Sequence, residues 1–273
     1  MSPVQEPSNY LDLDQWIQLE ETGSTNDYLM SSSHPAGTIV TAGKQIAGKG
    51  RSGRSWRSAG QALFFSGSFG WKQPPGPLFS LAMGLAVLEA LESYSALEPD
   101  DKKGLGLKWP NDVVRERVDA SYEKLGGILI EGKARGSDWQ TIVGIGLNWT
   151  SAPDPEAQDP LPPGKLIRGG KPGTSVLGDA SETEKGAVAM HSKLKDFLPL
   201  LVKRLNHFAV YYQNPSFLEE YKSREILQQR TVKLSGEDST ARVQGIDHQG
   251  SLILDNGTVL SDSARNLELQ TQS

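Results

Sequence analysis

The 273-residue chain contains no cysteine. This absence excludes a disulfide framework, a thiolate nucleophile, an iron–sulfur cluster and every zinc site built on cysteine. Long apolar runs are also missing, because no stretch approaches the roughly 18 residues that a membrane-spanning helix needs. The first ten residues lack the basic segment and apolar run of a secretory signal. We therefore expect a cytoplasmic protein without a membrane partner.

An excess of positive charge is absent as well. The chain has 28 Lys and Arg against 33 Asp and Glu, a formal net charge of -5 at pH 7. Neutralising nucleic-acid phosphates requires a concentrated Lys/Arg surface, so we expect no nucleic-acid partner. Hydrophobic residues make up 37% of the chain, which also holds 29 Gly and 16 Pro. This balance favours a loop-rich globular protein with a real core.

The pattern of apolar residues predicts an α+β fold with a mixed or antiparallel central sheet and flanking helices. The dense Pro, Gly, Asp and Lys of residues 151–186 predict a long loop. Strands are expected at 16–20, 38–42, 61–69, 105–109, 127–131 and 141–148, and helices through 29–30, 78–91, 194–212 and 217–226.

The C-terminal region has a different pattern. Short strands at 231–234, 241–246, 251–254 and 258–260, with turn signals at Gly250 and Asn256-Gly257, predict a small β-barrel. Since the length exceeds that of a typical single domain, we expect a catalytic domain at 1–227 and a barrel domain at 228–273.

The segment Gly48-Lys49-Gly50-Arg51-Ser52-Gly53-Arg54 is the most informative of the sequence. It matches the glycine pattern of dinucleotide-binding folds and nearly matches a P-loop, but both motifs open a helix, and here the strand pattern of 61–69 follows. A solvated charged turn is the plainer alternative. Against it, three glycines let the backbone wrap around a ligand while the cations can neutralise a carboxylate and a phosphate. With Trp56 beside it, the loop suits an adenylate.

Five segments together resemble the biotin protein ligase family. They are Gly23-Ser24-Thr25-Asn26, Gln45 to Trp56, Lys108-Trp109-Pro110-Asn111-Asp112, Lys124 to Glu131 and Gly144-Ile145-Gly146-Leu147-Asn148. The resemblance implies a catalytic fold like that of class II aminoacyl-tRNA synthetases, of the biotin/lipoate ligase type, with a C-terminal SH3-like barrel. About 20 residues precede the first motif, too few for a helix-turn-helix domain, so the short form of the family is expected.

The reaction that the resemblance implies has two steps. The biotin carboxylate attacks the α-phosphate of ATP to give biotinyl-5'-adenylate and pyrophosphate, with Mg²⁺ assisting, and a lysine amine then accepts the biotinyl group. The implied acceptor is the biotin carboxyl carrier protein of acetyl-CoA carboxylase. Cations are needed because the carboxylate and the phosphates repel each other.

The resemblance also assigns residues to this reaction. Lys124 is the leading catalytic candidate, with Arg51 and Asp112 beside it, and Asp112 is the one candidate for orienting Mg²⁺ or the incoming lysine amine. Biotin-binding positions are Ser24, Thr25, Asn26, Gln45, Lys49, Gly50, Arg51 and Lys124; nucleotide-binding positions are Arg51, Arg54, Trp56, Asn111 and Asn148.

Three positions depart from the family pattern. Lys49 and Ser52 stand where many relatives carry Arg, so a point charge replaces a bidentate contact. Gln244 stands where some relatives place an Arg that reaches toward the nucleotide, which questions a direct role of the barrel in binding ATP.

Three other functions compete with biotin ligation. A lipoate or octanoate ligase or transferase would share the fold, although Lys108 to Asp112 and the glycine-rich loop favour biotin. A biotin-sensing repressor would need a DNA-binding segment. A Ser/His hydrolase lacks a Gly-x-Ser-x-Gly motif, and no triad spacing is found among the histidines His34, His191, His207 and His248.

Overall fold

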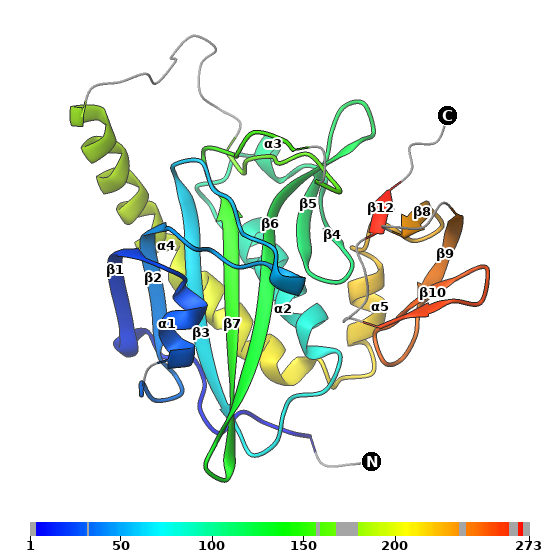
Figure 1. The fold of residues 1–273 in the computed structure, drawn as a ribbon, viewed down its shortest axis with the longest axis horizontal. Coiled ribbons are helices and arrows are strands. Elements are labelled where there is room, and N and C mark those ends of the chain that lie inside the picture. The colour runs from blue at the N-terminus through cyan, green and yellow to red at the C-terminus, as the bar shows by residue number, and fades with distance from the viewer. Residues whose placement is uncertain are drawn as a thin grey trace.

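The computed structural model describes residues 4–31, 33–156, 159–167, 180–234, 239–261 and 267–269, with only the backbone at 180–193 and 268. The central sheet has seven strands in the order β1-β2-β3-β7-β6-β5-β4 (Figure 1). Their bounds are β1 Trp16–Thr22, β2 Ile39–Gln45, β3 Ala62–Trp71, β4 Leu105–Lys108, β5 Asp112–Glu116, β6 Tyr122–Arg135 and β7 Asp138–Asn148. Only β1 and β2 pair in parallel among these neighbours, so the predicted mixed sheet is confirmed.

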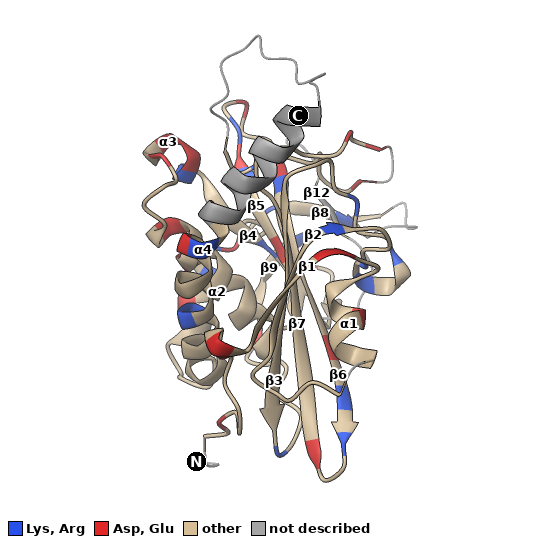
Figure 2. Ribbon diagram, turned by 90° about the vertical axis from the view of Figure 1, so that its left-hand side faces the viewer, with Lys and Arg blue, Asp and Glu red and all other residues tan. Residues whose placement is uncertain are grey.

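Helices cover both faces of this sheet unequally. α2 (Phe79–Ser93) and α4 (Ala180–Tyr211) lie on one face, and the short α1 (Thr25–Ser31) lies on the other (Figure 2). Every residue of β3, at the centre of the sheet, is buried, as expected for a strand covered on both faces. None of the described helices is long and apolar enough to cross a membrane. The α1 face is the thinly covered one, which leaves room there for a ligand.

Two smaller helices and two 3-10 turns complete the large domain. They are α3 (Pro99–Lys102), α5 (Phe217–Lys222), η1 (Leu13–Gln15) and η2 (Arg51–Gly53).

Two predictions about the helical regions are wrong. The loop expected up to residue 186 ends earlier, because α4 begins at Ala180; the Pro/Gly density that suggested a loop stops at Gly178, and helix-forming residues follow. α5 ends at Lys222 rather than reaching Ile226. The chain leaves the helix there to pair with β4, since Ile226 N donates to Leu107 O at 2.9 Å.

The C-terminal strands form a second, antiparallel sheet in the order β11-β10-β9-β8-β12. Their bounds are β8 Thr231–Leu234, β9 Thr240–Ile246, β10 Leu252–Leu254, β11 Val259–Leu260 and β12 Leu267–Leu269. The expected strands are confirmed and β12 is additional. Within the described residues β11 and β12 are each paired on one side only, so the strands of the predicted SH3-like barrel form an open five-stranded sheet. The boundary at 227/228 remains a prediction.

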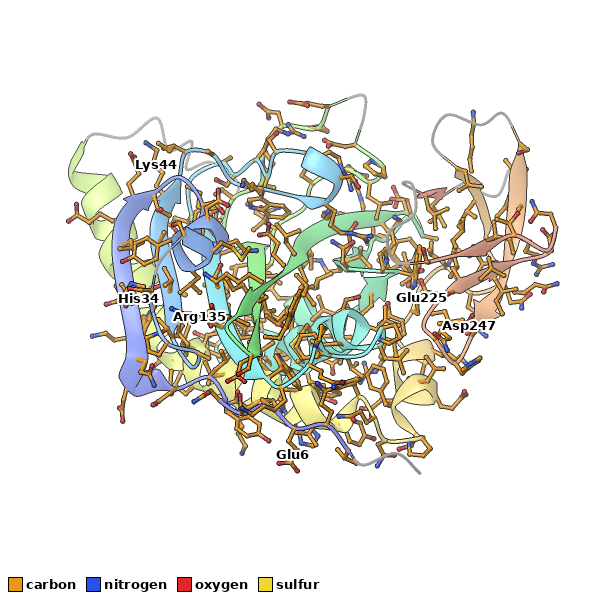
Figure 3. All side chains as sticks on the ribbon, turned by 60° about the horizontal axis from the view of Figure 1, so that its bottom comes forward. Glu6, His34, Lys44, Arg135, Glu225 and Asp247 are labelled. Atoms are coloured by element: carbon orange, nitrogen blue, oxygen red, sulfur yellow. The ribbon has the colours of Figure 1, made fainter. Side chains whose placement is uncertain are left out.

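A buried contact holds the small sheet against the large domain. Trp109 Nε1 donates to Gly250 O at 2.9 Å. Glu225, which lies beside the small sheet (Figure 3), accepts backbone N–H bonds from Trp109, Leu227 and Gln228 at 3.3, 2.9 and 3.0 Å. Burial raises the pKa of Glu225 to about 7. The small sheet is therefore docked on the loop that follows β4, next to Asp112.

Candidate active site

A cavity of about 350 Å³ opens on the α1 side of the sheet, within the size range of small-molecule sites. Its floor follows alternate residues of β7, namely Gly144, Gly146 and Asn148. At about 3.3 Å per residue these positions span roughly 13 Å. The cavity therefore has two ends, one at Gly144 beside α1 and one at Asn148.

The Gly144 end is closed by hydrogen-bonded polar side chains, here called the polar wall: Ser24, Thr25, Asn26, Gln45 and Ser66. Thr25 donates its backbone N–H and its hydroxyl to Gln45 Oε1, at 2.8 and 3.0 Å. The Ser66 hydroxyl donates to Asn26 Oδ1 at 2.6 Å and also lies 2.8 Å from Thr25 Oγ1. Asn26 Nδ2 donates to Glu131 Oε2 at 2.7 Å. Within the polar wall, Thr25, Asn26, Gln45 and Ser66 thus form a connected network in which each amide orientation is fixed by a neighbour.

Two glycines in the floor allow side chains to lie directly on the sheet. A Cβ at Gly144 would lie 2.2 Å from Asn26 Oδ1, and one at Gly146 would lie 2.7 Å from Trp56 Cε2. Neither space accepts a methyl group, so glycine at these positions is required for the position of Asn26 and of the Trp56 indole.

Lys124 and Asp112 meet between the two ends. Lys124 Nζ lies 2.7 Å from Asp112 Oδ1 and 5.6 Å from the centroid of the Trp56 ring. Burial raises the pKa of Asp112, but the charges of Lys124 and Lys108 lower it by more, so the net shift is downward. Asp112 is thereby held as a carboxylate, and it fixes the direction of the Lys124 ammonium.

The glycine-rich loop, Gly48–Arg54, links β2 to β3, as the sequence predicted. Backbone bonds close it, from Gly50 N to Arg54 O at 2.7 Å and from Trp56 N to Gly48 O at 2.8 Å. Within it Gly53 has a φ of +74°, which favours glycine. No helix of the P-loop or dinucleotide-binding kind follows, because β3 comes next.

Two side chains tie the glycine-rich loop to the rest of the site. Lys49 Nζ forms a 2.6 Å ion pair with Asp27 Oδ1 on α1, and this hydrogen bond raises the pKa of Lys49. Arg51 Nη1 donates to Asn111 Oδ1 at 3.1 Å. The loop is therefore fastened at both sides of the cavity.

The two asparagines predicted for the nucleotide differ in what they can still offer. Asn111 accepts from Arg51 and donates to Ile128 O at 2.8 Å, so both its amide atoms are engaged. Asn148 Nδ2 donates to Gly164 O at 2.9 Å, whereas its Oδ1 is buried without a partner among the described residues. Asn148, which lines its end of the cavity, therefore keeps one acceptor unpaired among the described residues.

The cavity brings together every predicted site residue except Asp112, which lies behind Lys124. A smaller cavity of about 30 Å³ borders Asp112, with Lys108 and Leu267 among its lining. Gln244, in β9, does not line either cavity. His34 and His207 stack on Tyr28 and Tyr211.

Sequence reasoning missed two parts of the site. Ser66 was hidden inside a buried strand, where its polarity among Phe64, Phe65 and Phe69 was the available signal. The second part is the pairing of Arg57 with Glu156 and Asp159 in the lining of the cavity, at 2.8 and 2.6 Å.

The surroundings of Asp112 do not favour a metal ion. Its carboxylate is paired with Lys124 and also senses the charges of Lys108 and Arg54, which would repel a divalent cation. Across the described residues no group of three or more His, Asp or Glu side chains could hold a metal. The suggested role of Asp112 toward Mg²⁺ is therefore not supported by the charges around it.

Comparison with known proteins gives a consistent result. The profile of the Biotin/lipoate A/B protein ligase family matches residues 17–148. The chain is 30% identical over 263 residues to a biotin–[acetyl-CoA-carboxylase] ligase of Mycobacterium tuberculosis, covering 89% of this chain and 85% of that protein. It is also 30% identical over 249 residues to the enzyme of that name from Paracoccus denitrificans, covering 86% and 92%. A biotin protein ligase from Aquifex aeolicus, solved in complex with biotin and ATP, superposes with a TM-score of 0.67 at 26% identity, covering 94% of this chain and 100% of that one.

Proposed function

Because the chain belongs to the biotin/lipoate A/B protein ligase family, we propose that it is a biotin–protein ligase, which activates biotin with ATP and transfers it to a lysine of a biotin carboxyl carrier protein. One observation carries the proposal. The Asp112–Lys124 ion pair lies between a polar wall at one end of the cavity and the unused Asn148 acceptor at the other.

The polar wall suits the ureido ring of biotin. That ring offers one carbonyl oxygen and two N–H groups, and it needs both donors and acceptors from the protein. Gln45 turns its oxygen toward Thr25, which leaves its NH₂ group for a ligand carbonyl, and Ser24 and Asn26 supply further polar atoms. A site of this kind rejects analogues without the ureido groups, since its buried partners would be left unpaired.

The first chemical step takes place at Lys124. A carboxylate oxygen of biotin attacks the α-phosphorus of ATP, the new O–P bond forms, and the bond from the α-phosphorus to the bridging oxygen breaks to release pyrophosphate. The Lys124 ammonium offsets the negative charges that approach each other, and Asp112 holds it in place. Arg51 and Arg54 add positive charge on the side of the glycine-rich loop.

The adenine would lie toward Asn148. Its exocyclic amine is a donor that matches the unpaired Asn148 Oδ1. Trp56, whose Nε1 is also buried without a partner among the described residues, lies between the two ends and offers its ring to the ligand.

In the second step a lysine amine attacks the acyl carbon of the adenylate. The amide C–N bond forms, the acyl C–O bond to phosphate breaks, and AMP leaves while the amine loses a proton. The relatives from Mycobacterium tuberculosis and Paracoccus denitrificans are biotin–[acetyl-CoA-carboxylase] ligases, which points to acetyl-CoA carboxylase as the source of that lysine. Asp112 is not proposed as a ligand of Mg²⁺, because the cations around its carboxylate would repel that ion, whereas the phosphates of ATP are ligands of the kind that Mg²⁺ takes.

The decisive experiment is biotin-dependent exchange of labelled pyrophosphate into ATP, measured beside lipoate and octanoate at equal concentrations. Exchange with biotin alone is the expected result. Exchange with lipoate or octanoate but not biotin would assign the chain to the other branch of its family and overturn the proposal. Transfer is then checked by mass spectrometry of a biotin carboxyl carrier domain, in which one lysine should gain a biotinyl group.

A further inference from the structure

Arg57 joins two segments that cover the same cavity. It follows directly on Trp56, and it contacts residues about 100 positions later. Its Nη1 lies 2.8 Å from Glu156 Oε1 and donates to Asp154 O at 2.9 Å, and its Nη2 lies 2.6 Å from Asp159 Oδ2. We call these contacts the Arg57 clamp.

The segment that the Arg57 clamp holds is here called the covering segment, residues 153–156 and 159–163, most of which line the cavity. Backbone bonds fix what precedes and follows it. Before it, Thr150 N donates to Gln61 O, and at its end Lys124 N donates to Pro162 O at 2.9 Å. Between these points, Asp154, Glu156 and Asp159 contact Arg57, and the Leu161 side chain is buried in a cluster with Val114 and Tyr122.

The covering segment brings negative charge to a site that must accept a polyanion. Glu156 and Asp159 both line the cavity, and their carboxylates would repel the phosphates of ATP. Arg57 lies between them and balances part of this charge. Without Arg57, these two carboxylates would weaken both the binding of ATP and the retention of the adenylate.

The Arg57 clamp is weak because its three side chains are partly exposed to solvent. The side chains of Arg57, Glu156 and Asp159 are 30%, 43% and 23% exposed, so each ion pair is partly screened by solvent. Contacts of this kind hold a segment closed but allow it to open. That balance suits a site which must retain a reactive adenylate and later admit a lysine.

We propose that Arg57 is a positioning residue with two effects: it fastens the covering segment over the nucleotide end of the cavity, and it neutralises Glu156 and Asp159 toward ATP. The second effect rests on the proposed function. The first concerns the fold alone and can be tested without substrate.

The test uses the full chain and three variants. Arg57→Ala removes the clamp, and the triple variant Arg57→Ala, Glu156→Gln, Asp159→Asn removes the clamp together with its negative charges. Arg224→Ala is the matched control, because Arg224 makes two contacts of 2.6 and 3.1 Å with Glu92 at a similar exposure of 38% and does not line the cavity.

Hydrogen exchange without ligand is the first readout. Arg57→Ala and the triple variant should exchange faster than wild type at the amides of the covering segment, which are those of Asp154, Glu156, Asp159 and Leu161, and Arg224→Ala should not. Unchanged exchange in both clamp variants would overturn the fastening role.

Kinetics is the second readout. Arg57→Ala should raise the KM for ATP and the release rate of the adenylate by up to about tenfold each. The triple variant should recover the KM for ATP but still release the adenylate fast. A KM that stays raised in the triple variant would overturn the neutralising role. If wild type shows no biotin-dependent exchange of pyrophosphate, the proposed function fails, while the hydrogen-exchange result still decides the fastening.

Discussion

The polar wall and the cover of the cavity are built on different principles. In the wall, Ser24, Thr25, Asn26 and Ser66 are each at most 3% exposed, and Ser66 is hydrogen-bonded to both Thr25 and Asn26. The cover, made of the glycine-rich loop and the covering segment, is held by ion pairs at the surface, such as Lys49–Asp27, whose side chains are 49% and 43% exposed.

This difference indicates that the polar wall and the cover have separate roles, one in recognising the ligand and the other in releasing it. Buried hydrogen bonds are costly to leave unmade, so the polar wall has one arrangement and recognises a ligand by shape and polarity. Exposed ion pairs each contribute roughly 0 to 1 kcal/mol and are screened by salt, so the cover opens easily. We expect substitutions in the wall to change selectivity and affinity, and substitutions in the cover to change release.

The largest effect is expected at Lys124, between the two regions. Lys124→Ala should slow adenylate formation by tens to several hundredfold, or about 2 to 4 kcal/mol, because the developing charge loses its cation. Biotin should also bind more weakly, since Lys124 is one of the predicted biotin-binding positions, but the loss in rate should exceed the loss in affinity because the wall and the cover stay intact. Single-turnover formation of the adenylate and biotin titration measure the two quantities.

The control for this variant is Lys72→Ala, which breaks a comparable 2.9 Å ion pair with Asp138 at the surface. A wild-type single-turnover rate in Lys124→Ala would contradict its assignment as the catalytic cation.

The next largest effect tests the wall through the floor beneath it. In Gly144→Ala the new Cβ would meet Asn26 Oδ1 at 2.2 Å, and Asn26 is already held by Ser66 and Glu131. Forcing the network apart costs about 1 to 3 kcal/mol, so the Kd for biotin should rise by up to about a hundredfold. Isothermal titration measures it.

Gly245→Ala serves as the control, because a Cβ there meets nothing within 4 Å. If Gly144→Ala binds biotin as wild type does, the wall is not the rigid element that the comparison requires.

A smaller effect is expected at Ser66, whose role in the wall is indirect. Ser66→Ala leaves Asn26 Oδ1 without its donor, and the Kd for biotin should rise about tenfold, or roughly 1 to 2 kcal/mol. Ser68, two positions further on the same face of β3, is equally buried but pairs with Gln140. Ser68→Ala should lose comparable stability and leave the Kd unchanged. Equal effects in the two variants would reduce Ser66 to a structural residue.

Ser66 also illustrates the limit of prediction from the sequence. The strand around it could be predicted from its apolar residues, and the central sheet and the five motif segments followed from local patterns and from the family resemblance. Its partners Thr25 and Asn26 lie 41 and 40 residues away. They come together because α1 packs on β3 and β7, at the place where Ser66 faces Gly144.

The contacts of the cover could be predicted only in part, because they too join residues that are far apart in the sequence. Arg57 lies three residues beyond the glycine-rich loop, for which a solvated charged turn was the plainer interpretation, and Glu156 and Asp159 lie in the stretch predicted to be a long loop. Their pairing spans about 100 residues. The C-terminal strands could likewise be predicted from their alternating apolar residues. The order of these strands in the small sheet depends on which strands pair with each other, and no local sequence pattern encodes that pairing.

The smallest effect concerns Lys49, one of the positions that depart from the family pattern. The test distinguishes two roles of this residue, fastening of the glycine-rich loop and direct contact with the ligand. Asp27→Asn removes the ion pair but keeps Lys49. A pair this exposed should change adenylate release by only about twofold, and by less at high salt. If Lys49 acts only by fastening the glycine-rich loop to α1, Lys49→Ala should match Asp27→Asn. Release from Lys49→Ala that is more than about tenfold faster would instead show direct contact with the ligand, as the family resemblance implies, and would move Lys49 from the cover to the binding surface.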